Sequence, residues 1–181
     1  MTEIRAATEQ DLDAALAVER AAFGEEADVI AGLVANLMKD DSAKPLLSLL
    51  AWDESTPIGH ILFTAAHLGG ADAPVRTSLL APLAVVPERQ KQGIGGQLIR
   101  HGLDMLRDQG VGLVFVLGHP EYYPRHGFEP AGRLGLHAPY PIPEEHADAW
   151  MVQALRPGLL GYVTGALKCA DAISPEEYWR E

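Results

Sequence analysis

The residues with the clearest chemical potential lie at positions 90–96, between an apolar stretch at 79–86 and an amphipathic stretch, and read Gln90-Lys91-Gln92-Gly93-Ile94-Gly95-Gly96. Glycines let a backbone approach a ligand more closely than a Cβ permits, and the first amides of a helix have no intrahelical partner. Phosphate oxygens accept hydrogen bonds from such amides, favoured by the positive end of the helix dipole. The segment is therefore predicted to be an anion-binding turn between a strand and a helix.

Two common nucleotide-binding patterns fit this turn poorly. A dinucleotide fingerprint has a third glycine three residues after the second, where this chain has Leu98. A P-loop closes with Gly-Lys-Ser/Thr, whereas Gly96 is followed here by Gln97. A dinucleotide-binding function is therefore the least favoured interpretation of this turn.

A second segment with chemical potential follows an apolar, β-branched run at 111–117, which predicts a buried strand. It reads Gly118-His119-Pro120-Glu121-Tyr122-Tyr123-Pro124-Arg125-His126-Gly127-Phe128. Histidine, glutamate and tyrosine are all side chains that transfer protons in active sites. One helix of about four turns and one strand separate this segment from the glycine-rich turn.

Together these two segments resemble the GCN5-related N-acetyltransferase (GNAT) superfamily. Gln90, Gly93 and Gly95 match its acyl-CoA loop, Gln/Arg-x-x-Gly-x-Gly/Ala, and the aromatic-Tyr-x-x-x-Gly-Phe ending at Phe128 is similar to the segment after its fifth strand. The wording around Tyr123 is similar to the YhbS-like branch, where aspartate is frequent at the position of His119. His119 is therefore a departure from the pattern.

The resemblance implies an acyl-CoA-dependent N-acetyltransferase in which an amine attacks the thioester of acetyl-CoA directly. The pyrophosphate would lie on amides from Gln92 to Gly96, with Arg89 nearby. A bulge in the fourth strand, near Leu83 or Ala84, would free an amide for the oxyanion; Pro82 cannot donate to a ladder and favours an irregular strand. The implied cofactor-binding residues are Leu83, Ala84, Val85, Gln90, Lys91, Gln92, Gly93, Ile94, Gly95 and Gly96.

For proton transfer, the resemblance assigns Tyr123 as the general acid that protonates the departing thiolate. Tyr122 is expected to pack on the sheet with its hydroxyl in solvent, since adjacent residues usually face different ways. His119 is the first candidate for the general base because histidine ordinarily titrates near neutrality. Weaker candidates are Glu121, His60 and His67.

The elements that must position these residues follow from hydrophobic periodicity. Helices are expected to end near Phe23 and to span 25–39 and 96–109. Strands are expected at 4–7, 46–52, 58–66, 79–86, 111–117 and 150–155, with another at 162–167. The fold class is mixed α/β: the order agrees with a GNAT fold, a central mixed, mostly antiparallel sheet flanked by helices. With 181 residues, 48% of them hydrophobic, the chain fits one GNAT domain over 1–181.

Composition narrows the partners. Fourteen Lys and Arg against 25 Asp and Glu give a net charge of −11, which repels nucleic acid and attracts cations. No stretch has the length and apolarity of a membrane span and the start does not resemble a signal peptide, so neither a membrane partner nor secretion is expected. The single Cys169 excludes an internal disulfide. These features favour a cytoplasmic protein in a reducing compartment.

The histidines lack metal-protease spacing, so no metal site is expected. We expect a small primary amine as acceptor, with Tyr140, Glu144, Glu145 and Asp148 as residues that could line its side of the site. A homodimer is compatible with the sequence. A different function class also remains open at this stage: a non-catalytic acyl-CoA-binding sensor or interaction module.

Overall fold

A computed structural model describes residues 2–69 and 75–180. Within these ranges the chain is a mixed α/β fold with a mostly antiparallel sheet, as predicted. The α-helices and strands are β1 (Thr2–Ala6), α1 (Leu12–Phe23), α2 (Ala27–Lys39), β2 (Leu47–Asp53), β3 (Thr56–Gly69), β4 (Thr77–Val85), α3 (Ile94–Asp108), β5 (Leu113–Leu117), β6 (Glu129–Pro130), β7 (Leu136–His137), β8 (Trp150–Ala154) and β9 (Gly165–Lys168).

The predicted elements shift by a few residues at their ends. Helix α2 begins two residues later than expected, because 24–26 form a 3-10 turn, and α3 begins at Ile94 rather than at Gly96. The strand expected at 162–167 is β9, which begins only at Gly165. The sequence analysis did not predict β6 or β7, since two-residue strands carry no periodic pattern.

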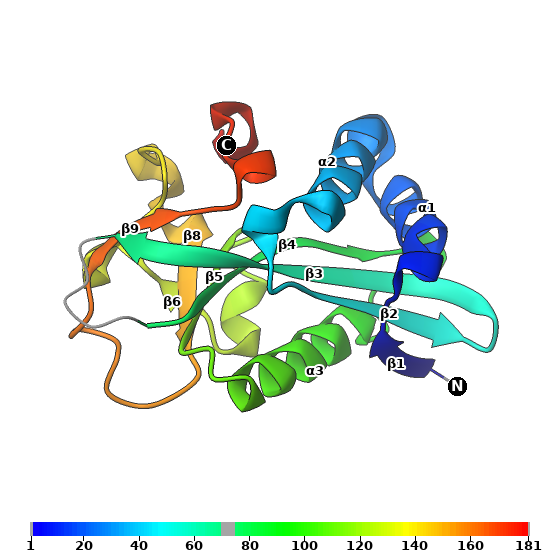
Figure 1. Cartoon of the computed structure of the whole chain (residues 1–181), viewed down its shortest axis with the longest axis horizontal. Helices are drawn as coiled ribbons and strands as arrows, with labels where there is room; N and C mark the ends of the chain where they lie inside the picture. Colours follow the sequence, from blue (N-terminus) through cyan, green and yellow to red (C-terminus); the bar gives the residue numbers. More distant parts are fainter. Residues whose placement is uncertain (1, 70–74, 181) are drawn as a thin grey trace.

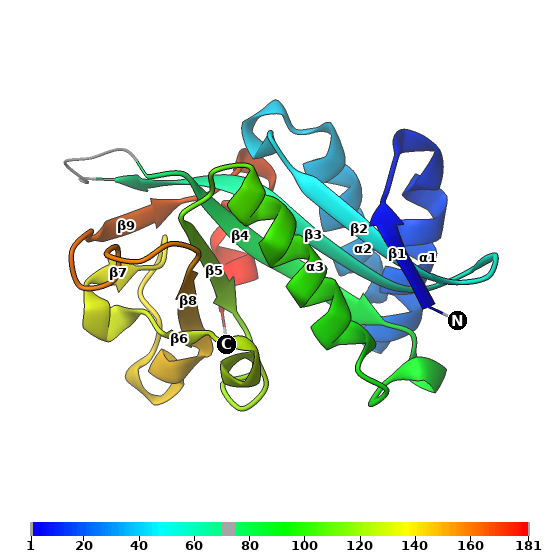
Figure 2. The ribbon, with the colours of Figure 1, turned by 90° about the horizontal axis from the view of Figure 1, so that it is seen from below.

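The strands follow the order β1-β2-β3-β4-β5-β8-β6, and β9 pairs with both β3 and β7. Neighbours on the main path are antiparallel except for β4 and β5, which are parallel. Helices α1 and α2 cover one face of the sheet and α3 covers the other (Figure 1; Figure 2). Apolar side chains of α3, including Leu98, Ile99 and Leu103, pack into the core on that second face.

Strand β4 is irregular in its pairing with both of its neighbours, β5 and β3. The strands pair only from Thr77 to Leu79 of β4, opposite Leu113 to Phe115 of β5, although both continue further. The pairing of β4 with β3 also slips: Phe63 lies opposite Leu80 but Ile61 lies opposite Leu83. The extra residue falls at Ala81–Pro82. The bulge predicted near Leu83 or Ala84 is therefore present, immediately before Leu83.

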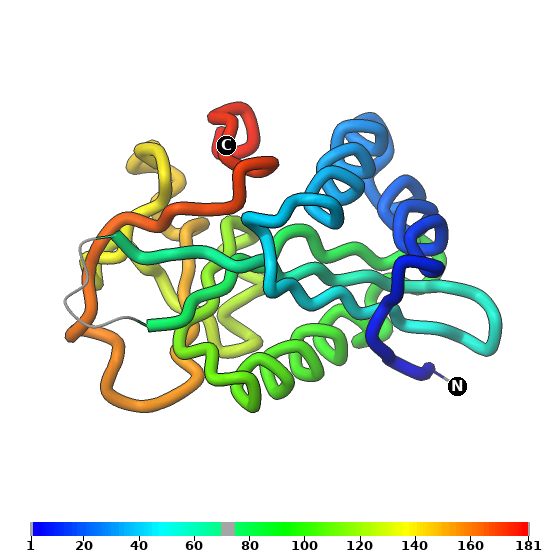
Figure 3. Tube along the Cα trace, in the orientation of Figure 1, coloured from blue at the N-terminus to red at the C-terminus, as the bar shows by residue number. Residues whose placement is uncertain are grey.

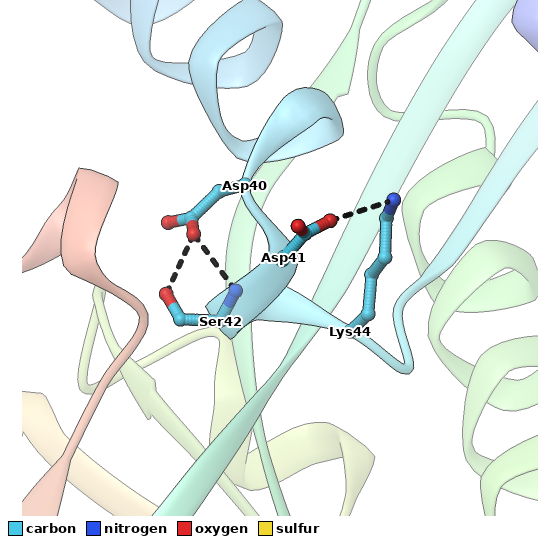
Figure 4. Close-up of polar contacts among 4 residues, drawn as sticks. All are labelled: Asp40, Asp41, Ser42 and Lys44. Atoms are coloured by element: carbon cyan, nitrogen blue, oxygen red, sulfur yellow. Dashed lines mark hydrogen bonds and ion pairs between the residues drawn. The ribbon is translucent and has the colours of Figure 1, made fainter.

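The C-terminal segment runs back from β9 and passes beside the connection between α2 and β2, at the 3-10 turn Asp171–Ile173 (Figure 3). Asp40 organises that connection, accepting hydrogen bonds from the Ser42 amide at 2.9 Å and the Ser42 hydroxyl at 2.6 Å (Figure 4). It also accepts from the Ala172 amide at 2.9 Å, while the Asp171 amide donates to Ser42 Oγ at 2.8 Å. These bonds attach the end of the chain to the α2–β2 connection.

The helices of the described chain include none that is long and apolar enough to cross a membrane. Cys169 is buried, and burial raises the pKa of its thiol to about 12. The thiol is therefore protonated near neutral pH, which agrees with a packing role and not with a nucleophilic one.

Candidate active site

A cleft of about 770 Å³ opens where β4 and β5 part. The end of β4, the glycine-rich turn, the first turns of α3 and the segment after β5 form its walls. The residues that line it are Leu83, Val85, Arg89, Gln90, Lys91, Gly93, Ile94, Gly95, Gly96, Arg100, His119, Tyr122, Tyr123, Arg125 and His126. The fold thus brings together the two segments singled out in the sequence.

The glycine-rich turn leaves the start of α3 open. Gly93 precedes the helix in the left-handed conformation, with φ +84°, which a residue with a Cβ adopts only at a cost. Gly93 has no side chain that could cap the helix. The first hydrogen bond of the helix runs from the Gln97 amide to the Gly93 carbonyl. The amides of Ile94, Gly95 and Gly96 therefore have no partner within the helix and can donate hydrogen bonds to an anion.

Polar side chains of the turn hold its shape. Arg89 donates hydrogen bonds to Asp53 of β2 at 2.7 Å and to Gln92 Oε1 at 3.2 Å. The hydrogen bond from Arg89 lowers the pKa of Asp53. Gln90 Nε2 donates to the Val85 carbonyl at 3.0 Å. Arg89 is thus engaged with the protein, whereas Lys91 is exposed and makes no ion pair with the residues that the structure describes.

Of the predicted cofactor-binding residues, all but Ala84 and Gln92 line the cleft. Ala84 is buried in the core, because alternate residues of β4 point to opposite sides of the sheet and its neighbours Leu83 and Val85 take the cleft side. The Gln92 side chain contacts Arg89 and the Glu88 carbonyl instead.

The two tyrosines do not point as expected. Tyr122 is half-buried and lines the cleft, and a Cβ added to Gly95 would lie 2.5 Å from its hydroxyl oxygen. The expectation that the two tyrosines face different ways is wrong: both line the cleft, because they lie at a 3-10 turn, where strand alternation does not apply. Tyr122 also packs against the hydrophobic core. Tyr123 also lines the cleft, but its ring is only 8% exposed and packs edge-on against Tyr122 and Phe128.

Burial, with a smaller contribution from Tyr122, raises the pKa of Tyr123 above that of an ordinary phenol. The hydroxyl consequently carries its proton throughout the physiological range. It can donate to a negative charge that develops in the cleft, but it is not a base at neutral pH.

The four candidates for the general base differ in their positions and surroundings. His119 is exposed at the cleft. His60 is fully buried: its Nδ1 is 2.6 Å from Glu19 Oε2 and its Nε2 is 2.8 Å from Ser48 Oγ, so it cannot reach a substrate in the cleft. His67 lines a different hollow near Lys44 and Arg76. Glu121 lies in a surface hollow that also includes His119 and Tyr122.

Residues 3–131, which include the residues that line the cleft, match the family model of the acetyltransferase (GNAT) domain. The chain belongs to the GNAT family. It is 55% identical to the uncharacterized N-acetyltransferase YjhQ of Escherichia coli over 158 residues, which are 85% of this chain and 84% of YjhQ. It is 35% identical to E. coli YhbS over 144 residues, 79% of this chain and 82% of YhbS.

Solved GNAT structures agree with this membership. The crystal structure of E. coli YhbS in complex with CoA has a TM-score of 0.84 at 31% identity, covering 95% of this chain and 91% of YhbS. A Brucella melitensis GNAT acetyltransferase in complex with acetyl-CoA has a TM-score of 0.75 at 29% identity, with 96% and 98% covered. This GNAT chain is an acyl-CoA-dependent N-acetyltransferase.

Four residues of this GNAT cleft were not predicted as site residues from the sequence: Arg100, Tyr122, Arg125 and His126. A Cβ on Gly96 would lie 2.8 Å from His126 Cε1, so His126 packs against Gly96 as Tyr122 packs against Gly95. The four-residue spacing from Gly96 to Arg100 was an available signal, since residues four apart share an α-helix face. Among the described residues, no group of three or more His, Cys, Asp or Glu could hold a metal.

Proposed function

We propose that this enzyme transfers the acetyl group of acetyl-CoA to a small primary amine by direct attack, with Tyr123 as the general acid. The observation that carries the proposal is the convergence, in one cleft, of the open amides of α3, the bulged end of β4 and Tyr123. Each of these features supplies one requirement of acyl transfer: anion binding, oxyanion stabilisation and protonation of the leaving group.

The pyrophosphate of the cosubstrate would lie on the amides of Ile94, Gly95 and Gly96, within reach of Lys91. Residues with a Cβ at positions 95 and 96 would already collide with Tyr122 and His126. The missing Cβ atoms of Gly95 and Gly96 therefore make room for Tyr122 and His126, whose rings border the open amides at the start of α3. The diphosphate of coenzyme A would bind on these amides, beside the two rings.

The pantetheine arm would then extend along Leu83 and Val85, which line the cleft where β4 has left β5. Directly before Leu83, the bulge at Ala81–Pro82 interrupts the ladder with β3. A bulge leaves a backbone group unpaired, and an unpaired amide near Leu83 can stabilise the oxyanion that forms when the amine attacks. This placement follows the family resemblance.

Collapse of the tetrahedral intermediate releases the CoA thiolate, and Tyr123 would donate its proton to the sulfur as negative charge develops there. The raised pKa of Tyr123 keeps the donor protonated until that moment. A free thiolate has a parent thiol pKa of about 8.5, so protonation makes the reverse reaction harder.

The amine is proposed to enter beside His119, which also borders a second hollow of about 330 Å³. Glu145 and Asp148 line that hollow, so two of the four acidic and aromatic candidates are in a position to attract a cation. Tyr140 instead donates its hydroxyl to the Ser174 carbonyl, and Glu144 does not line the hollow. His119 is the candidate base that removes the proton from the ammonium group.

The test is CoA release from acetyl-CoA with a panel of polyamines, aminoglycosides, amino acids and lysine peptides. Turnover with at least one class of small primary amine is expected. Turnover confined to long protein substrates would refute the small-amine proposal. Binding of acetyl-CoA without turnover on any amine would instead identify the chain as an acyl-CoA sensor.

A further inference from the structure

Two arginines border the cleft beside its anion-binding turn. Arg100 is on α3, four residues after Gly96, and therefore about 6 Å further along the same helix face. Arg125 lies in the 3-10 turn Tyr123–His126, which faces that part of α3. Both side chains are exposed, and both also line an adjoining groove of about 320 Å³, together with Gly96, His126 and the Asp104–Arg107 ion pair.

These two guanidinium groups have no counter-ion within residues 2–69 and 75–180. Their neighbours differ, since Arg89 is paired with Asp53 at 2.7 Å and Arg107 with Asp104 at 3.0 Å. Burial and the charges of Arg100 and Arg125 lower the pKa of His126, which lies against the same turn. A chain with a net charge of −11 thus gathers unpaired positive charge at one edge of its cleft.

We propose that Arg100 and Arg125 bind the 3′-phosphate of coenzyme A in the groove between α3 and the Tyr123–His126 turn. This rests on the proposed function, which puts the pyrophosphate on the first turn of α3. The 3′-phosphate and the 5′-pyrophosphate are carried by the same ribose, so the second anion must lie close to the first. A phosphate monoester carries nearly two negative charges, and arginine binds phosphate oxygens with paired N–H donors.

The consequence is selectivity for the complete cofactor. Backbone amides recognise the pyrophosphate, which CoA shares with its 3′-dephospho analogue. Arg100 and Arg125 contact the group that distinguishes them. The site therefore discriminates between the two molecules through these side chains.

Equilibrium binding of CoA and of 3′-dephospho-CoA to the full chain tests this proposal. The wild type is expected to prefer CoA by roughly tenfold or more, the scale of a charge-assisted hydrogen bond. Arg100→Gln and Arg125→Gln should each reduce this ratio, and the double variant should abolish it, losing much more affinity for CoA than for dephospho-CoA. Arg20→Gln is the matched control: it removes one positive charge from α1, where Arg20 is only 3.9 Å from Asp28, and should keep the ratio.

Equal affinities of the wild type for the two ligands, or a ratio that survives in the double variant, would overturn the assignment of the 3′-phosphate. CoA release with amines would then continue, and the proposed function would stand. Failure of the wild type to bind either ligand would overturn the cofactor placement itself, and with it both proposals.

Discussion

At the scale of single residues, Tyr123 carries the most specific chemical claim. Tyr123→Phe removes only a hydroxyl from a ring held by Tyr122 and Phe128, so packing should survive. We expect kcat to fall by about 10²-fold or more, with little change in the affinity for acetyl-CoA. Because the pKa of Tyr123 is raised, the wild type should also show no loss of kcat from tyrosine ionisation as the pH rises to about 10.

Steady-state kinetics of both proteins across the pH range provide the measurement. If Tyr123→Phe and the wild type have the same profile, water protonates the thiolate and the tyrosine is structural. Tyr122→Phe is the matched control, because the same atom is removed from the adjacent ring in the same cleft.

Gly95 has two reasons to be glycine, and a double variant separates them. A valine would obstruct the approach of the pyrophosphate and would also collide with the Tyr122 hydroxyl. We expect Gly95→Val to remove the thermal stabilisation that acetyl-CoA gives the wild type, and NADH to give none to either protein. Adding Tyr122→Ala relieves the second collision only, so stabilisation should stay absent. Recovery in the double variant would mean that the glycine serves the tyrosine and not the ligand.

Sequence reasoning located the turn because glycine spacing is a direct consequence of backbone sterics. It failed for Tyr122 because the rule of alternating faces belongs to strands, and the residues before Gly127 form a 3-10 turn. It missed Arg100 and Arg125 as a pair because they are 25 positions apart on different elements. Their proximity to one cleft is a product of tertiary structure.

At the scale of elements, α1 is joined to the sheet by a buried polar contact. Glu19 of α1 and His60 of β3 have fully buried side chains, and Glu19 Oε1 has no hydrogen-bond partner among the described residues. Burial raises the pKa of Glu19, although the hydrogen bond and charge of His60 act in the opposite direction. The sequence analysis kept His60 as a weaker candidate for the general base. Its structural role could not be predicted, because its partner Glu19 is 41 residues away in the chain.

Removing one member of this contact should destabilise the fold more than removing both. His60→Leu leaves a buried carboxyl without its partner, which costs about 3–5 kcal/mol in comparable buried pairs. Glu19→Leu with His60→Leu replaces both groups by apolar ones and should cost less. Urea unfolding at pH 7 measures the two free energies. An equal or larger loss in the double variant would show that the contact itself, and not the isolated carboxyl, dominates.

The strands illustrate what periodicity can predict. Strands β2, β3, β4, β5 and β8 are long enough to show an apolar pattern, and their expected ranges overlap the observed ones. The separation of β4 from β5 was not expected from sequence. It depends on pairing that stops after Leu79, and only the proline of the adjacent bulge gave a local indication.

At the scale of the whole molecule, the end of the chain is attached through Asp40. Hydrogen bonds from the Ser42 side chain and the Ala172 amide lower the pKa of this carboxyl. Stability from a lowered pKa is present above the pKa of the unfolded chain and is lost as the pH falls through the folded value. Asp40→Asn should therefore lower the midpoint of urea unfolding at pH 7 but have less effect at pH 3. Equal effects at the two pH values would exclude the charge of Asp40 as the cause, and Asp41→Asn is the neighbouring control.

The whole molecule also reconciles a net charge of −11 with an anionic cosubstrate. Open helix amides and the cations at the cleft edge provide local attraction, while charges further away are screened over about 8 Å at physiological salt. Under the proposed function, acetyl-CoA is bound where that local attraction is concentrated, and the acceptor amine approaches past Glu145 and Asp148.

Under the proposed function, the cleft between β4 and β5 holds acetyl-CoA with its sulfur at Tyr123, and a crystal structure of the complex with CoA would reveal this placement. We expect pyrophosphate oxygens within hydrogen-bond distance of the amides of Ile94, Gly95 and Gly96, and the sulfur within reach of the Tyr123 hydroxyl. A pyrophosphate bound away from that turn, or a sulfur that contacts neither Tyr123 nor the bulged end of β4, would contradict it.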